Sequence, residues 1–269
     1  MNRRQFALAS SALAAVAIGS AAAGAEPPAT LATVIAGPQR TDKNRARDPA
    51  RHPAQSLAFW GLASGMTVVE IDPSGGYWTE ILAPYLRATH GRYIGAFDGD
   101  AAAFKARYVD PAVWGTIETA AFGQTSGPLA APGSVDFLLT ARNIHDWMWT
   151  PGLLEKALAD FHAALKPGGI LAVEEHRADP RPMVADAHDG YVSTAYLIAA
   201  VEKAGFKLAA SSEINANPKD TKDHPFGVWT LPPTLRNHAK GQTTPPDYDA
   251  AKYVAIGESD RMTLRFTRV

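Results

Sequence analysis

The sequence predicts a doubly wound α/β domain, in which helices cover both faces of a mostly parallel sheet. Short apolar runs recur along the chain without polar alternation, as expected of strands that are buried on both sides. Between these runs lie segments whose apolar residues recur at spacings of three and four, which is typical of helices. This repeated order of strand, helix and strand gives right-handed crossovers and parallel pairing. A chain of 269 residues is long enough for one such domain with a large core.

The first 25 residues have the composition of an export signal. The stretch RRQF at residues 3–6 precedes an apolar, alanine-rich run, which ends in the small residues Ala23 to Ala25. A basic start, an apolar core and a small-residue cleavage site are the three parts of such a signal, and the weak hydrophobicity of the run disfavours a membrane span. Because RRQF resembles a twin-arginine signal, we expect export of a folded protein, cleavage after about Ala25 and a periplasmic location.

Charge and cysteine content exclude several kinds of function. Removing Arg3 and Arg4 with the signal leaves 24 of the 26 basic residues against 27 acidic residues, so the remainder carries a net charge of −3. This balance favours neither nucleic acid nor an anionic membrane as a partner, and we expect a small-molecule substrate. The chain contains no cysteine, which excludes disulfides, thiolate nucleophiles and cysteine-bound metals.

Residues 26–56 form a separate N-terminal arm in this prediction, and the domain proper extends from residue 57 to residue 269. The arm is rich in Pro, Ala, Arg and Asp with little periodicity, so we expect an extended segment or a short helix that lies on the domain. Apolar runs within the domain predict seven strands, at Thr67–Ile71, Arg92–Phe97, Gly115–Ala120, Val135–Thr140, Ile170–Glu174, Lys207–Ser211 and Met262–Arg268.

Helical periodicity is clearest in the second half of the chain. Apolar residues recur with helical spacing over Leu153–Leu165, with Thr150 as the expected N-cap, and the sequence KPGG at residues 166–169 stops this helix. A second helix is predicted over Tyr191–Lys203, where Gly205 follows its end.

A long segment without strand or helix periodicity breaks this pattern. Residues 215–258 are dense in Pro, Asp, Lys and Thr, and a loop of this length in a compact domain is usually disordered or functional. Its apolar residues disfavour disorder, so we expect a flap packed over the domain before the last strand. Two interpretations remain open: the flap covers the strand ends at a functional site, or it merely covers an apolar face.

Glycine and polar residues follow the predicted strands at their carboxyl ends, where ligands bind in open parallel sheets. The first strand is followed by Asp72, Ser74, Gly75 and Gly76. The two glycines allow a ligand to approach the backbone closely at the start of a helix near Tyr77. Asp98 follows the second strand, where a carboxylate can accept hydrogen bonds from ribose hydroxyls. The fourth and fifth strands are followed by Asn143, His145, Asp146, Trp147, Glu174, Glu175, His176 and Arg177.

The chain resembles class I S-adenosylmethionine-dependent methyltransferases in four stretches of matching order and spacing: VVEIDPSGG, GRYIGAFD, VDFLLTARNIHDW and ALKPGGILAVEEHR. It is also similar, in NIHDW, EEHR and NPKDTKDHPFGVWTLPP, to a group of exported bacterial proteins described as predicted methyltransferases. The resemblance extends from about residue 57 to the C-terminus. It implies a Rossmann-like sheet, S-adenosylmethionine as cofactor and methyl transfer to a small molecule in the periplasm.

The resemblance also assigns roles to the residues of the first loop. In this superfamily an acidic residue is followed by three glycines at alternate positions. Here Glu70 takes the acidic position, and the glycine positions fall on Asp72, Ser74 and Gly76. Asp98 takes the ribose-binding position. The implied cofactor-binding residues are Glu70, Asp72, Ser74, Gly75, Gly76, Asp98 and Asn143.

The side chains at positions 72 and 74 have physical consequences. Asp72 disfavours a dinucleotide, because its carboxylate would repel a pyrophosphate. The sulfonium cofactor has no phosphates, so this objection does not apply to it. A side chain at position 72 would, however, crowd the turn if the backbone there needs a positive φ.

The candidate catalytic residues are His145, Asp146 and His176. In a methyltransferase, His145 or Asp146 would orient or deprotonate the accepting oxygen or nitrogen. Without the cofactor, a histidine–carboxylate group supports proton abstraction in an isomerase, lyase or hydrolase. A divalent metal bound through His145, Asp146, Glu174 or His176 is a further reading, but no close ligand spacing is recognisable and we predict no metal.

A last alternative is a non-enzymatic protein that uses the cofactor cleft to bind a periplasmic small molecule. S-adenosylmethionine is made in the cytosol, so a periplasmic location counts against sustained methyl transfer. A methyltransferase that acts on a small molecule is nevertheless the leading prediction, and the two functions that need no methyl donor are its alternatives. Fold by itself does not decide between these three functions.

Overall fold

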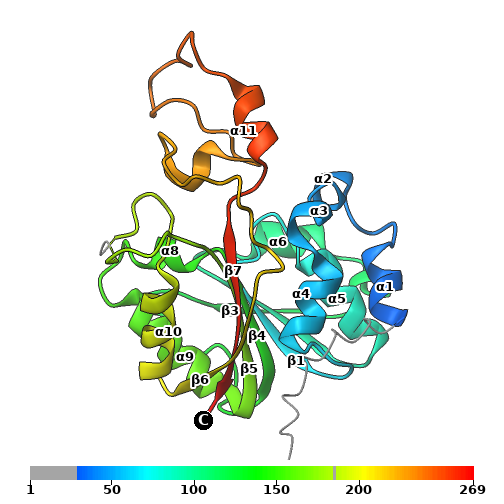
Figure 1. Cartoon of the computed structure of the whole chain (residues 1–269). Coiled ribbons are helices and arrows are strands. Elements are labelled where there is room, and N and C mark those ends of the chain that lie inside the picture. The colour runs from blue at the N-terminus through cyan, green and yellow to red at the C-terminus, as the bar shows by residue number, and fades with distance from the viewer. Residues whose placement is uncertain (1–28, 184–185) are drawn as a thin grey trace, which may run out of the picture.

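The computed structural model describes residues 29–183 and 186–269, and Figure 1 shows their arrangement. The centre of this described part is a seven-stranded sheet with the strand order β3-β2-β1-β4-β5-β7-β6. Strands β1 to β5 pair in parallel, and β7 runs antiparallel to both β5 and β6. The predicted doubly wound, mostly parallel sheet is therefore confirmed. The strands are β1 (Thr67–Ile71), β2 (Arg92–Phe97), β3 (Ile117–Ala121), β4 (Val135–Ala141), β5 (Leu165–His176), β6 (Phe206–Ser212) and β7 (Arg261–Arg268).

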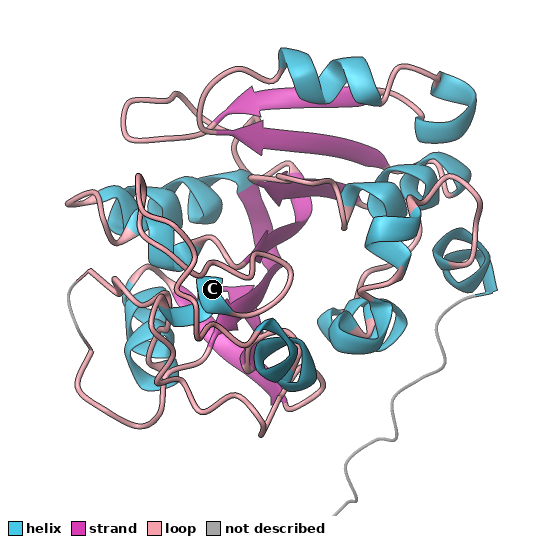
Figure 2. Ribbon diagram, turned by 90° about the horizontal axis from the view of Figure 1, so that it is seen from above, coloured by secondary structure: helices cyan, strands magenta, loops and turns pink. Residues whose placement is uncertain are grey.

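Helices cover both faces of the sheet, as the view from above shows (Figure 2). Residues of α1, α4 and α5 pack on one face, and those of α8, α9 and α10 pack on the other. None of the described helices is long and apolar enough to cross a membrane. The helices are α1 (Ala29–Ile35), α2 (Asp42–Arg45), α3 (Asp48–Arg51), α4 (Pro53–Trp60), α5 (Thr79–Ala88), α6 (Ala102–Arg107), α7 (Pro111–Trp114), α8 (Ile144–Trp147), α9 (Leu153–Ala164), α10 (Thr194–Lys203) and α11 (Ala250–Ile256), with a 3₁₀ turn η1 (Gly227–Thr230).

Strand β1 shows how one apolar run fills two cores. Successive side chains of a strand point to opposite faces. Val69 and Ile71 join the core under α9, whereas Val68 joins the core under α5. Glu70 shares the face of Val68 and is equally buried. The absence of alternation in the sequence thus reflects burial on both faces.

The first two predicted strands have the observed bounds, and the others differ by a few residues at their ends. β5 shows the largest difference. It begins at Leu165, because the chain passes from α9 directly into the strand through the KPGG stretch. It ends at His176, where it still pairs with Arg261 of β7.

The predicted N-cap of α9 is wrong. The helix begins at Leu153, and its N-cap is Gly152 with a φ of 79° rather than Thr150. The reason is a preceding turn, in which the backbone N–H of Thr150 donates to the carbonyl of Trp147. A left-handed glycine is what allows the chain to leave this turn and enter the helix.

The predicted start of α10 is wrong as well. The helix begins at Thr194 rather than Tyr191, with the side chain of Ser193 as its N-cap. The preceding residues are extended, because the backbone N–H of Val192 donates to the carbonyl of His176 at 2.9 Å. Pairing with the end of β5 therefore overrides the local helical pattern.

The N-terminal arm is helical over most of its described length, as α1 to α4, and α4 crosses the boundary predicted at residue 57. Arg40 donates to Asp48 at 2.6 and 2.7 Å within the arm. The backbone N–H of Thr41 donates to Glu80 at the start of α5 at 2.9 Å. These contacts fix the arm beside the loop that follows β1. The predicted export signal, residues 1–25, lies outside the described residues.

The segment predicted as a flap, residues 215–258, connects β6 to β7 above the carboxyl ends of the parallel strands (Figure 1). Its base is fixed by Asp220, which is buried. The carboxylate of Asp220 accepts hydrogen bonds from the hydroxyl of Tyr191 and from Nε2 of His224, both at 2.9 Å. It also accepts one from the backbone N–H of Asp260 at 2.7 Å. The flap is therefore packed on the domain.

Candidate functional site

The loop after β1 keeps a glycine-type backbone although two of its positions carry side chains. Asp72 has a φ of 43°, Ser74 a φ of 49° and Gly76 a φ of 77°. These left-handed angles favour glycine, and among other residues aspartate tolerates them better than most. The turn is fixed at its start by the backbone N–H of Asp72, which donates to the carbonyl of Ala96 at 2.8 Å. Asp72 and Ser74 thus adopt the left-handed backbone that glycine favours.

The two adjacent glycines of the loop have different requirements. A Cβ at Gly76 would lie 1.8 Å from the hydroxyl oxygen of Tyr108, and the positive φ would strain any L residue there. A Cβ at Gly75 would meet no atom within 4 Å. Glycine is therefore required at position 76 and not at position 75.

Gly76→Ala is expected to lower the free energy of unfolding by about 1–2 kcal/mol, because alanine is strained at this φ. Gly75→Ala is the matched control and is expected to change it by no more than about 0.5 kcal/mol. Urea unfolding of both variants measures the difference. Equal stability of the two variants would contradict the described loop.

Glu70 is buried beneath the loop and connects β1 to α5 and β2. Its Oε2 accepts hydrogen bonds from the hydroxyl of Thr79 at 2.8 Å and from the hydroxyl of Tyr93 at 2.7 Å. Burial raises the pKa of Glu70 to about 7, although both hydroxyls favour the charged form. Glu70 thus helps to hold the loop in place by linking β1 to α5 and β2.

The raised pKa of Glu70 makes stability depend on pH. Between the ordinary pKa of about 4.5 and the folded-state pKa of about 7, the folded protein binds the proton more tightly than the unfolded chain. The stabilising contribution is complete below pH 4.5 and is lost as the pH rises to 7. Glu70→Gln removes this titration. The stability of Glu70→Gln relative to the native protein is therefore expected to increase by roughly 3 kcal/mol between pH 4.5 and 7.5. A pH-independent difference in urea unfolding would refute this.

An outer cavity of about 570 Å³ lies above the ends of β1 and β2. Asp98 lines it, and the backbone N–H of this residue donates to Oδ1 of Asp72 at 3.1 Å. The exposed carboxylate of Asp98 faces Gly123, whose added Cβ would lie 3.1 Å from Oδ1. The outer cavity is therefore lined by the carboxylate of Asp98 and, beside it, by Asp72 and Ser74 of the loop.

An inner cavity of about 230 Å³ continues from the outer one toward β4, β5 and the flap. Both cavities are lined by Asp72, Ser74, Asn143 and Asp146. Asn143 is buried between the two strand ends, and its side-chain amide donates to the carbonyl of Ile71 at 2.9 Å. Together the cavities form one trough that passes over the loop, and we call it the central trough.

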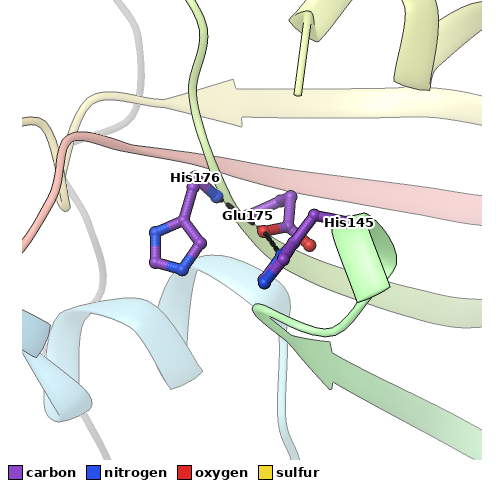
Figure 3. A group of neighbouring side chains, drawn as sticks. All are labelled: His145, Glu175 and His176. Atoms are coloured by element: carbon purple, nitrogen blue, oxygen red, sulfur yellow. Dashed lines mark hydrogen bonds and ion pairs between the residues drawn. The ribbon is translucent and has the colours of Figure 1, made fainter. Parts of the chain in front are cut away.

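Figure 3 shows the polar group at the inner end of the central trough, His145, Glu175 and His176. Nδ1 of His145 lies 2.9 Å from Oε1 of Glu175, and both side chains are buried. Because the carboxylate only accepts, Nδ1 of His145 carries a proton. Nε2 of the same ring lies 3.4 Å from Oδ1 of Asp146. Glu175 is itself held by the backbone N–H groups of Ile144 at 2.7 Å and His176 at 2.8 Å.

The electrostatic surroundings shift the pKa values of the two histidines in opposite directions. Burial lowers the pKa of His145, but the adjacent Glu175 carboxylate outweighs it, and the net pKa is raised. Burial and the positive charge of His145 and Arg142 hold the pKa of His176 well below its usual range. His145 is thus suited to accept a proton, while His176 stays neutral beside Ser259, which lies 2.5 Å from its Nδ1.

The same three residues offer metal-ligating atoms within 4.8 Å of one another. Both oxygens of Glu175, however, already accept hydrogen bonds from the backbone and from His145. Glu174 points to the face of β5 opposite to Glu175, where it pairs with Arg261 at 2.9 Å. The hydrogen-bonded pair of His145 and Glu175 accounts for this arrangement without a metal.

Similarity to known proteins is found in the structure and not in the sequence. No protein-family model matches the chain, and no curated protein matches its sequence. A SAM-dependent methyltransferase from Aquifex aeolicus shares 16% identity and a TM-score of 0.53, covering 83% of this chain and 93% of its own. The [4+2]-cyclase SpnF shares 15% identity and a TM-score of 0.57, covering 91% of this chain and 99% of its own.

A third similar structure is a 1,6-didemethyltoxoflavin-N1-methyltransferase from Burkholderia thailandensis, which contains 1,6-didemethyltoxoflavin and S-adenosylhomocysteine. It shares 12% identity and a TM-score of 0.50, covering 85% of this chain and 83% of its own. The chain has the class I methyltransferase fold. Most of the residues predicted from the sequence line this trough, but Gly76 lines neither cavity. Asp98 lines the outer cavity alone, and the inner cavity alone is lined by Glu70, Gly75, His145 and His176. Both cavities are lined by Asp72, Ser74, Asn143 and Asp146.

Three residues of the trough were not predicted as site residues from the sequence. Trp229 of the flap packs against the ring of His145 with centroids 5.7 Å apart, and Arg47 and Arg51 of the N-terminal arm line the inner cavity. The tryptophan was visible as an apolar residue of the flap, and the arginines as part of a basic stretch. Neither pattern indicates which strand end the residue reaches. The N-terminal arm and the flap thus each supply part of the wall of the inner cavity.

Proposed function

We propose that the protein binds S-adenosylmethionine along the central trough and transfers its methyl group to an oxygen or nitrogen of a small molecule. The observation that carries this proposal is the continuity of the trough from Asp98, over the left-handed loop, to His145. When bound, the cofactor supplies an electrophilic methyl group on a sulfonium. Carboxylates at Asp72, Asp98 and Asp146 suit this cation and its ribose hydroxyls, whereas they would repel a pyrophosphate.

In this proposal Asp98 accepts hydrogen bonds from the ribose hydroxyls, and the backbone of the loop supports the cofactor from below. Gly75 lines the inner cavity, and an added Cβ there would meet no atom within 4 Å, so the backbone is open to a ligand at this position. The space beside Gly76 is filled by Tyr108. Asn143 holds the ends of β1 and β4 together beneath the point where the two cavities meet. These residues bind and orient the cofactor.

His145 then acts as the general base. Its Nε2 takes the proton from the accepting hydroxyl or amine, and Glu175 stabilises the resulting imidazolium through Nδ1. Asp146 lies 3.4 Å from the same Nε2 and helps to orient the acceptor. The indole rings of Trp229 and Trp149, with centroids 5.7 Å apart, reduce the access of water to this end.

The binding part of the proposal is tested by replacing the carboxylate of Asp98. Asp98→Asn is expected to weaken S-adenosylhomocysteine binding by about tenfold or more, because hydrogen bonds to a charged group are lost. Asp100→Asn is the matched control, since Asp100 is equally exposed but lies outside both cavities. Titration calorimetry measures both. Equal affinities would exclude Asp98 as the ribose ligand.

A second candidate function is cofactor-independent acid–base catalysis. The pair of His145 and Glu175 needs no methyl donor to move a proton. One of the similar structures, SpnF, is named as a [4+2]-cyclase and not as a methyltransferase. An activity that needs His145 in a protein that does not bind S-adenosylhomocysteine would favour this function.

We further propose that residues 1–25 direct the protein to the periplasm as a folded chain. The RRQF start and the small-residue site support this proposal. Fractionation of cells that express the full chain tests it, with a variant in which Arg3 and Arg4 are lysine as the control. Retention of both proteins in the cytosol would refute export and would remove the supply problem for the cofactor.

A further inference from the structure

A cluster of buried arginines lies at the inner end of the central trough, opposite the histidines. Arg47 and Arg51 come from the N-terminal arm, and both donate to the carboxylate of Glu258, at 2.7 and 3.0 Å. Arg261 donates to the same carboxylate at 2.8 Å and pairs with Glu174 at 2.9 Å. The nearest ion pair of Arg142 is also with Glu174, at 3.8 Å. Four guanidinium groups therefore share two carboxylates.

Several guanidinium nitrogens of this cluster have no hydrogen-bond partner among the described residues. They are Nη1 and Nη2 of Arg51, Nη2 of Arg47, and the Nε atoms of Arg142 and Arg261. The side chain of Arg51 has 0% of its surface exposed, and both arginines line the inner cavity. The Nη atoms therefore belong to two residues that line the cavity, of which Arg51 is fully buried and Arg47 has 17% of its side chain exposed.

The geometry of Arg51 is fixed before any ligand binds. Its guanidinium lies over the ring of Tyr77, 4.5 Å from the centroid. The hydroxyl of Tyr77 donates to Asp48 at 2.7 Å, and Asp48 is already neutralised by Arg40. Asp48 thus pairs with Tyr77 and Arg40 and not with Arg51. Nε of Arg51 donates to Glu258, and its two Nη atoms have no hydrogen-bond partner among the described residues.

Four guanidinium groups against two carboxylates leave an excess of positive charge, which is unfavourable in a largely buried cluster. A guanidinium fork matches the two oxygens of a carboxylate or phosphate. The acidic residues that face the same cavity are Glu258, already shared by three arginines, and Asp72 and Asp146 at the opposite end. Glu70 also lines the cavity, but it is held by Thr79 and Tyr93. None of them pairs with the free nitrogens in the described structure.

We propose that Arg47 and Arg51, supported by Arg142, form a subsite for an oxyanion in the inner cavity. Two sources provide this chemistry: the carboxylate at the amino-acid end of the cofactor, or an acid group on the accepting molecule. The choice between these sources rests on the proposed function, whereas the subsite itself does not. If the acceptor supplies the group, the substrate class is a small acid whose body lies against Trp229.

The subsite is tested by titrating inorganic phosphate into the purified protein at constant ionic strength. The native protein is expected to bind phosphate, and Arg47→Gln is expected to weaken this binding by about tenfold or more. Arg45→Gln is the matched control, because Arg45 lies in the same arm but outside the cavity. Arg51→Lys gives a second variant that keeps the charge and loses the fork. Binding that is absent in the native protein, or equal in Arg47→Gln and Arg45→Gln, would overturn the subsite.

A second titration distinguishes the two sources. Phosphate is titrated into protein saturated with S-adenosylhomocysteine. Loss of phosphate binding assigns the subsite to the carboxylate of the cofactor, and retained binding assigns it to the acid group of the acceptor. If S-adenosylhomocysteine does not bind, the proposed methyl transfer fails, while the phosphate titration of the free protein still decides the subsite.

Discussion

His145→Gln is expected to lower kcat of methyl transfer by about 10²–10⁴-fold, because the variant has no base to take the proton of the acceptor. The affinity for S-adenosylhomocysteine should stay within about twofold, since the loop and Asp98 are unchanged. Single-turnover kinetics and titration calorimetry separate the two effects. His162→Gln, on the outer helix α9, is the control and is expected to leave both unchanged.

The companion variant Glu175→Gln tests whether the carboxylate acts through His145. The Glu175 carboxylate raises the pKa of His145, so its loss should move the acid limb of the pH–rate profile to lower pH while kcat falls. A purely structural role of Glu175 would lower activity without moving the profile. Full activity of His145→Gln would exclude this residue as the base.

Glu258→Gln is expected to lower the free energy of unfolding by about 3–5 kcal/mol, because it removes the counter-charge of three buried arginines. Its carboxylate accepts from Arg47, Arg51 and Arg261, and only 8% of its side chain is exposed. Urea unfolding at pH 7 measures the loss.

Glu213→Gln is the matched control for this loss. Glu213 also pairs with an arginine, at 2.7 Å from Arg177, but 71% of its side chain is exposed. Its replacement is expected to cost no more than about 1 kcal/mol. Similar losses in the two variants would show that the buried arginines do not depend on Glu258. Added phosphate should restore part of the stability of Glu258→Gln if the oxyanion subsite exists.

The sheet could be predicted closely from the sequence because its central strands are buried on both faces. The bounds of β1 and β2 followed from apolar runs alone, and the polar residues after them were correctly placed at the carboxyl edge. Helix starts were less predictable. The N-terminal ends of α9 and α10 depend on a turn at Gly152 and on pairing of Val192 with β5, and neither is visible in local periodicity.

The candidate site was predictable only where it follows the strands. His145 follows β4 and His176 is the last residue of β5, so the pairing of these two strands brings the histidines together. Arg51 and Trp229 reach the trough from segments outside the strand–helix pattern, and nothing in the sequence fixes their direction. The loop is an intermediate case. The sequence predicts that the side chain of Asp72 crowds the turn if the backbone there needs a positive φ. The structure shows that φ of Asp72 is positive.

Titration calorimetry of the purified native protein with S-adenosylmethionine, and then with S-adenosylhomocysteine, tests the central claim most directly. Mass spectrometry must first show that the protein carries no bound ligand. The proposed cofactor site predicts a dissociation constant in the micromolar range, equivalent to about −8 kcal/mol. No heat of binding from ligand-free, folded protein would contradict methyl transfer and leave His145 and Glu175 as the centre of a cofactor-independent reaction.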